Sequence, residues 1–94
     1  LAGAPGTMQR AWGSACHGAG RVMSRGQAMK RWKGKDLLAR LRRQGVFVRT
    51  GSVKEVAEEA PGAYKDVSAV IEATVGAGLA LAVARLRPLA CVKG

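Results

Sequence analysis

The residues with the clearest chemical potential lie in one short stretch, Gly13 to Gly20, which is followed by Arg21 and Arg25. It contains His17, the only histidine of the sequence. An imidazole can attack phosphorus as a nucleophile, and the guanidinium group of arginine binds phosphate oxygens two at a time. Glycine lets the backbone approach a ligand closely. The stretch therefore favours a phosphoryl or nucleotidyl transfer site.

The glycines also resemble the start of a helix, which we expect to run from Gly18. The free N–H groups of a first helical turn bind anions, and helical spacing would place His17, Arg21 and Arg25 on one face. The alternative is a loop or cap histidine with no chemical role. The stretch lacks the Lys-Ser/Thr of a P-loop and the glycine spacing of a dinucleotide fingerprint. Spacing alone leaves both interpretations open.

Three blocks of sequence carry a resemblance to a known family. They are CHGAGRVMSR from Cys16, EEAPGAYKDV from Glu58 to Val67, and ARLRPLACVKG from Ala84 to Gly94. Together they resemble the C-terminal end of the RtcB family of RNA ligases, in that family's order and spacing. Family members are several times longer, so we expect residues 1–94 to be one incomplete segment of a larger α/β catalytic domain.

The resemblance implies a chemistry. Family members use GTP and Mn²⁺ to join 2′,3′-cyclic phosphate or 3′-phosphate RNA ends to 5′-hydroxyl ends, through a histidine that carries GMP. His17 matches that catalytic histidine. The implied nucleotide site comprises His17, Gly18, Ala19, Gly20, Tyr64 and Lys93. The implied manganese ligands lie outside this chain, so we expect the chain alone to be inactive and assign it no metal ligand.

The resemblance also implies partners. These are RNA, as tRNA halves or broken RNA, the missing N-terminal part of the same protein, and an archease-type activator. We assign Arg21 and Arg25 to RNA or nucleotide phosphates, with a structural salt bridge as the competing role. Arg85 and Arg87 are a second candidate pair, because residues two apart on a strand face the same way.

Positive charge is concentrated in the first half of the chain. The formal net charge is +10, and ten of the sixteen Lys and Arg residues fall between Arg21 and Arg49, with Asp36 as the only acid there. Such a field attracts polyanions without choosing a sequence. A non-catalytic basic nucleic-acid-binding module is therefore the alternative function. A structural fragment whose basic face meets acids of an absent segment is a third.

The remaining composition sets the expected environment. The sequence has two cysteines and neither a signal peptide nor a spanning helix, so we expect a cytoplasmic protein with no membrane partner. We expect Cys16 and Cys91 to be small buried groups. Alanine-rich apolar content predicts a core of small side chains.

The expected fold is α+β, with short helices packed on a small β-sheet. We interpret Glu58 and Glu59 as surface acids, because adjacent helical residues diverge too far to act as an acid/base pair. Trp12 is expected to pack its helical turn against the core, with the stacking of a base as the less favoured role. The predicted segments are a strand end at Leu1 to Gly3, a helical turn from Met8 to Trp12, a helix from Gly18 to Trp32 that Gly26 weakens, a helix from Asp36 to Gln44, a strand from Val46 to Thr50, a short helix from Ser52 to Ala60, a helix from Asp66 to Gly76, and extended segments from Leu79 to Arg87 and Leu89 to Lys93.

Overall fold

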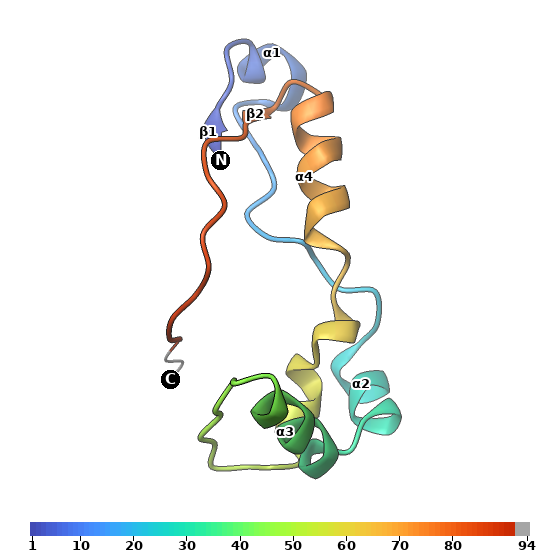
Figure 1. Cartoon of the computed structure of the whole chain (residues 1–94). Helices are drawn as coiled ribbons and strands as arrows, with labels where there is room; N and C mark the ends of the chain where they lie inside the picture. Colours follow the sequence, from blue (N-terminus) through green and yellow to red (C-terminus); the bar gives the residue numbers. More distant parts are fainter. Residues whose placement is uncertain (92–94) are drawn as a thin grey trace. The chain divides into compact units, whose positions relative to one another are not determined.

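The structure, a computed structural model, describes residues 1–91 and divides into two compact units. One comprises Leu1–His17 and the chain from Ser68 onward, and the other is Gly18–Val67. The helices are short and the sheet has two strands, as Figure 1 shows, so the predicted α+β class is confirmed.

The first unit contains the sheet. Strand β1 (Ala2–Gly3) pairs antiparallel with β2 (Ala80–Leu81), so that Ala2 lies opposite Leu81. Helix α1 (Thr7–Ala11) follows β1, which confirms the predicted strand end and helical turn. Helix α4 (Val67–Gly76) begins directly after Asp66 and ends at Gly76, as the sequence predicts. Of the segments predicted to be extended after α4, only Ala80–Leu81 forms a strand within residues 1–91, and the end of the second segment lies outside the described residues.

The second unit is built from helices. These are α2 (Arg25–Arg31), α3 (Gly34–Arg43) and two 3₁₀ turns, η1 (Glu55–Glu59) and η2 (Pro61–Ala63). Both α2 and α3 contact η1. The buried apolar side chains of this unit are Ala28, Leu37, Ala57, Ala60 and Ala63. Small side chains let the elements approach closely, and the prediction of a core of small residues is confirmed.

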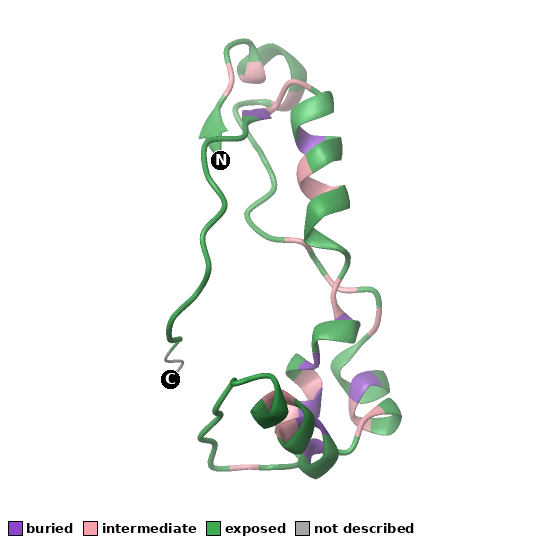
Figure 2. Ribbon diagram, viewed as in Figure 1, coloured by how far each residue is buried: buried purple, intermediate pink, exposed green. Residues whose placement is uncertain are grey.

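Several large apolar residues are exposed. Exposed residues are the green parts of the ribbon in Figure 2. Trp12 is 90% exposed, so the prediction that it packs against the core is wrong. Phe47 is 77% exposed, and residues 46–50 are irregular, so the predicted strand is also wrong. β-Branched content favours a strand only where a neighbouring strand completes its hydrogen bonds, and no described segment pairs with this one.

The cysteines also differ from expectation. Cys16 and Cys91 are both exposed, so the prediction that they are buried is wrong. The Cys16 Sγ lies 3.2 Å from the hydroxyl of Thr74, a buried residue that donates to the Val70 carbonyl over 2.8 Å. This contact fixes the residue before His17 to helix α4.

No helix within residues 1–91 combines the length and the apolar character that crossing a bilayer requires.

Candidate functional site

Two of the sequence blocks meet through their backbones in the second unit. Arg21 and Tyr64 form an isolated antiparallel bridge, in which the Val22 N–H donates to the Ala63 carbonyl over 2.9 Å and the Lys65 N–H donates to the Gly20 carbonyl over 3.0 Å. These bonds flank Arg21 and Tyr64, which are therefore a non-hydrogen-bonded pair. Side chains lie closest in such pairs. The bridge joins Gly20 and Arg21 to the nucleotide-site tyrosine that the sequence predicts.

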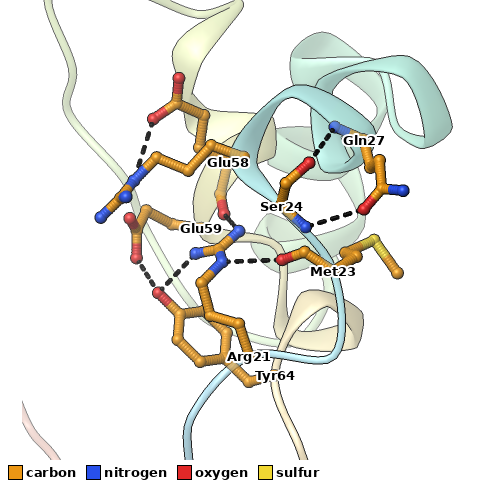
Figure 3. Close-up of polar contacts among 8 residues, drawn as sticks. Arg21, Met23, Ser24, Gln27, Glu58, Glu59 and Tyr64 are labelled. Carbon is orange, nitrogen blue, oxygen red and sulfur yellow. Dashed lines mark hydrogen bonds and ion pairs between the residues drawn. The ribbon is translucent and has the colours of Figure 1, made fainter.

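The side chain of Arg21 completes this junction, as Figure 3 shows. Its Nη1 donates to the Tyr64 hydroxyl over 3.0 Å, its Nε donates to the Met23 carbonyl over 3.1 Å, and its Nη2 donates to the Glu58 carbonyl. The guanidinium carbon also lies 4.8 Å from the centroid of the Tyr64 ring, within cation–π range. All three guanidinium nitrogens thus have partners inside the unit, so Arg21 has a structural role, although through hydrogen bonds to a phenol and two carbonyls rather than through the predicted salt bridge.

The hydroxyl of Tyr64 has a second partner. It donates to the carboxylate of Glu59, while it accepts from Arg21. A phenol that both donates and accepts is fixed in rotation as well as in position. Neither the residue type of Glu59 nor its spacing from Tyr64 signals this contact in the sequence. Glu59 is exposed, as predicted.

Arg25 lies at the first position of α2. Its Nε is 3.7 Å from the carboxylate of Glu58, and its side chain is 66% exposed. A salt bridge this open contributes little to stability and leaves most of the guanidinium accessible. Arg25 therefore differs from Arg21, whose nitrogens are engaged within the unit.

The start of α2 corrects one prediction. Ser24 caps the helix, because its hydroxyl accepts from the Gln27 N–H over 3.1 Å and its own N–H donates to the Gln27 side chain over 2.9 Å. The helix therefore begins at Arg25 and ends at Arg31, so the predicted end is confirmed and the predicted start at Gly18 is wrong. Because residues 17–24 are not helical, the predicted single face of His17, Arg21 and Arg25 is wrong too. The capping-box signature was present in the sequence as Ser24 and Gln27.

The stretch before α2 has another conformation. Gly20 has a φ of +75°, which residues with a side chain rarely adopt. Its carbonyl accepts a hydrogen bond from the Lys65 N–H. In the described part of the chain, no hydrogen bond has the N–H of Gly18, Ala19 or Gly20 as its donor. A Cβ built on Gly18 or Gly20 would meet no atom within 4 Å. These N–H groups have no acceptor among residues 1–91 and can donate to an anion, although no helix dipole supports them.

His17 is exposed, and it is the last residue of the N-terminal segment of the first unit. Its ring is therefore not part of a packed interior, and a reagent can reach it from solvent.

The structure brings together Gly20, Arg21 and Tyr64 in the second unit. Lys93, which the sequence assigns to the nucleotide site, lies outside the described residues. Arg85 and Arg87 are exposed, and their predicted strand is absent.

Residues 1–91 contain no group of three His, Cys, Asp or Glu side chains that could hold a metal ion. The first unit thus offers an accessible imidazole, and the second unit offers backbone donors without an acceptor among residues 1–91 and a fixed phenol. These are groups that bind and attack a phosphate ester.

Comparison with known proteins shows that the whole chain is similar to the members of one family. The model of a family described as "tRNA-splicing ligase RtcB" matches residues 1–94. The chain is 50% identical over 94 residues to a tRNA-splicing ligase RtcB of Methanopyrus kandleri and 49% identical to that of Pyrococcus furiosus. It is 52% identical to an RNA-splicing ligase RtcB of Mycobacterium tuberculosis.

Each of these alignments covers 100% of the chain, but the chain spans only 10% of the two archaeal relatives and 21% of the mycobacterial one.

Proposed function

The chain belongs to the RtcB family of tRNA-splicing ligases, and from this membership we propose that it forms part of a GTP- and Mn²⁺-dependent RNA ligase. In this proposal the protein joins a 2′,3′-cyclic phosphate or 3′-phosphate RNA end to a 5′-hydroxyl end. The family match supports RNA ligation in general, and the sequence blocks motivate the nucleotide, the metal and the histidine.

The proposal assigns the first chemical step to His17. A ring nitrogen of His17 attacks the α-phosphorus of GTP. The nitrogen–phosphorus bond forms as the bond from that phosphorus to the bridging oxygen breaks, and the electron pair leaves with pyrophosphate. The observation that carries this assignment is the exposure of His17, which directly precedes three N–H groups without an acceptor among residues 1–91.

The later steps use the same phosphate chemistry. Water first opens a cyclic phosphate to a 3′-phosphate. An oxygen of the 3′-phosphate attacks the phosphorus held by His17, which frees the imidazole. The 5′-hydroxyl oxygen then attacks the activated RNA phosphorus, loses its proton and displaces GMP, so that a phosphodiester joins the two ends.

The neighbouring groups have binding roles in this proposal. The N–H groups of Gly18, Ala19 and Gly20 would donate to phosphoryl oxygens, where negative charge grows during each step. Tyr64 would bind beside the nucleotide with its ring held by Arg21 and Glu59. Lys93, which lies outside the described residues, is proposed to donate to the guanine carbonyl oxygen.

Manganese, when bound, would stabilise charge on the phosphoryl oxygens. The described residues do not fit the ion by themselves, because no three candidate ligands gather among them. We therefore propose that its ligands belong to other parts of the protein.

The test is the labelled adduct. The full-length protein that carries this chain is incubated with GTP labelled at the α-phosphorus and Mn²⁺, and covalent label is counted after denaturation. We expect His17→Ala to abolish the adduct. Ser14→Ala, an exposed neighbour in the same stretch, should leave it intact. An adduct retained by His17→Ala would refute the assignment.

The concentrated positive charge also supports the alternative of a non-catalytic basic nucleic-acid-binding module. That alternative predicts salt-sensitive binding to any RNA or DNA and no guanylate adduct.

A further inference from the structure

A hollow of about 370 Å³ lies beside the link between α2 and α3, within the second unit. Four cationic side chains line it together with one carboxylate, that of Asp36, and two apolar residues, Trp32 and Leu37. The four cations are Arg31, Lys33, Arg40 and Arg43. None of the residues in the proposed nucleotide site belongs to this hollow.

The sequence builds the hollow through a very short connection. Helix α2 ends at Arg31 and α3 begins at Gly34, so only Trp32 and Lys33 join them, both in extended conformation. On α3, Asp36, Arg40 and Arg43 are spaced four and three residues apart and share one face. The short link turns that face toward Arg31 and Lys33, while Leu37, which is 3% exposed, provides an apolar floor.

Trp32 is a fixed wall of the hollow. A Cβ at Gly62 would lie 2.7 Å from its ring carbon Cζ2, so the indole packs directly against the Gly62 backbone. The guanidinium carbon of Arg31 lies 5.1 Å from the ring centroid. The indole therefore orients Arg31 at the rim, which reduces the entropy that Arg31 would lose on binding a ligand.

The charge of the hollow is not neutralised within the described chain. None of the four cations forms a salt bridge with any of residues 1–91, although Asp36 shares the hollow with them. Like charges held this close repel one another, and a polyanion relieves that repulsion when it binds. Three of the four are arginines, whose planar forks match phosphate oxygens in pairs.

From this arrangement we propose that the hollow binds phosphodiester groups of RNA and anchors the strand whose end is to be joined. The inference rests on the proposed function for its choice of RNA. The site is separate from the nucleotide-binding groups, so it would hold the RNA chain by its backbone, without reading its sequence.

The test compares two double variants of the full-length protein. Arg40→Ala/Arg43→Ala removes two charges from the hollow. Lys35→Ala/Arg42→Ala removes two charges from the same helix outside it, and all four residues are exposed. Affinity for a fluorescent single-stranded RNA with a 3′-phosphate is measured by anisotropy, without GTP, over a range of salt concentrations.

We expect the hollow variant to bind RNA about tenfold more weakly, because charge-assisted bonds to phosphate are lost. The slope of log affinity against log salt should fall by about 1 to 2. The control pair should change affinity by less than about threefold, since it alters only the general field. Equal losses in both variants would overturn the proposal. So would competition by polyglutamate as strong as that by RNA, which would indicate an acidic protein partner.

Two further measurements distinguish a failure of the RNA site in the hollow from a failure of the proposed function and from misfolding of a variant. Guanylylation of His17 needs no RNA, so its absence in the unaltered protein would refute the proposed function rather than the hollow. Cross-linking of 4-thiouridine RNA to the unaltered protein needs no variant to fold. Cross-linked peptides spanning 31–43 are expected, and cross-links found only elsewhere would overturn the proposal.

Discussion

The guanidinium of Arg21 lies over the ring of Tyr64, 4.8 Å from its centroid, and donates to the hydroxyl of the same residue over 3.0 Å. The two residues are 43 positions apart in the sequence and are paired through an antiparallel bridge. One arginine therefore joins the segment after His17 to the EEAPGAYKDV block. The geometry of the proposed nucleotide site depends on a cation that itself need not touch the nucleotide.

Replacing that cation should loosen the junction. Arg21→Lys keeps the charge but removes the planar fork, so the bonds to Tyr64, Met23 and Glu58 cannot all form. The lost bonds should lower the free energy of local opening at this junction by about 1 to 2 kcal/mol. The amides of Val22 and Lys65 should therefore exchange with deuterium roughly tenfold faster. Arg25→Lys is the control, because its single contact is an open salt bridge. Unchanged exchange in Arg21→Lys would contradict the structural role of this residue.

The hydroxyl of Tyr64 can be tested separately from its ring. Tyr64→Phe retains the ring under Arg21 and removes the bonds to Arg21 and Glu59. We expect the GTP concentration for half-maximal guanylylation to rise by about three- to tenfold, because a ring that has lost these bonds is less well positioned. Tyr64→Ala should raise it further. If both variants behaved like the unaltered protein, Tyr64 would have no part in nucleotide binding.

The capping box of α2 predicts a local effect on stability. Ser24→Ala removes the acceptor for the Gln27 N–H and should lower the stability of helix α2 by about 1 kcal/mol. Amides in α2, including that of Ala28, should then exchange about fivefold faster. Exchange in α4, which does not contain this cap, serves as the internal control. Equal acceleration in both helices would indicate a global rather than a local loss.

The chain by itself should not form the adduct. Residues 1–94 carry His17 but no described group of three metal ligands, so we expect no labelled GMP on the isolated chain in GTP and Mn²⁺. The measurement is the labelled-adduct assay applied to the 94-residue chain and, in parallel, to the full-length protein. A labelled isolated chain would show that the metal ligands are not needed from elsewhere.

Local signals in the sequence predicted some elements well. The turn at Met8 to Trp12 and the helix after Asp66 follow from caps, spacing and glycine stops, which act within a few residues. The same applies to the helix α3, although it begins two residues earlier than Asp36. The true start of α2 was also a local signal, in Ser24 and Gln27, but the glycines before it favoured a different start.

The sequence by itself determined the family, the block that contains His17 and the concentration of positive charge, because these depend only on residue types and their order. The tertiary structure decided what Arg21 does and which cations line a common hollow, since both depend on segments that meet only after folding. It also decided that residues 46–50 do not form a strand, because a strand needs a neighbour to complete its hydrogen bonds.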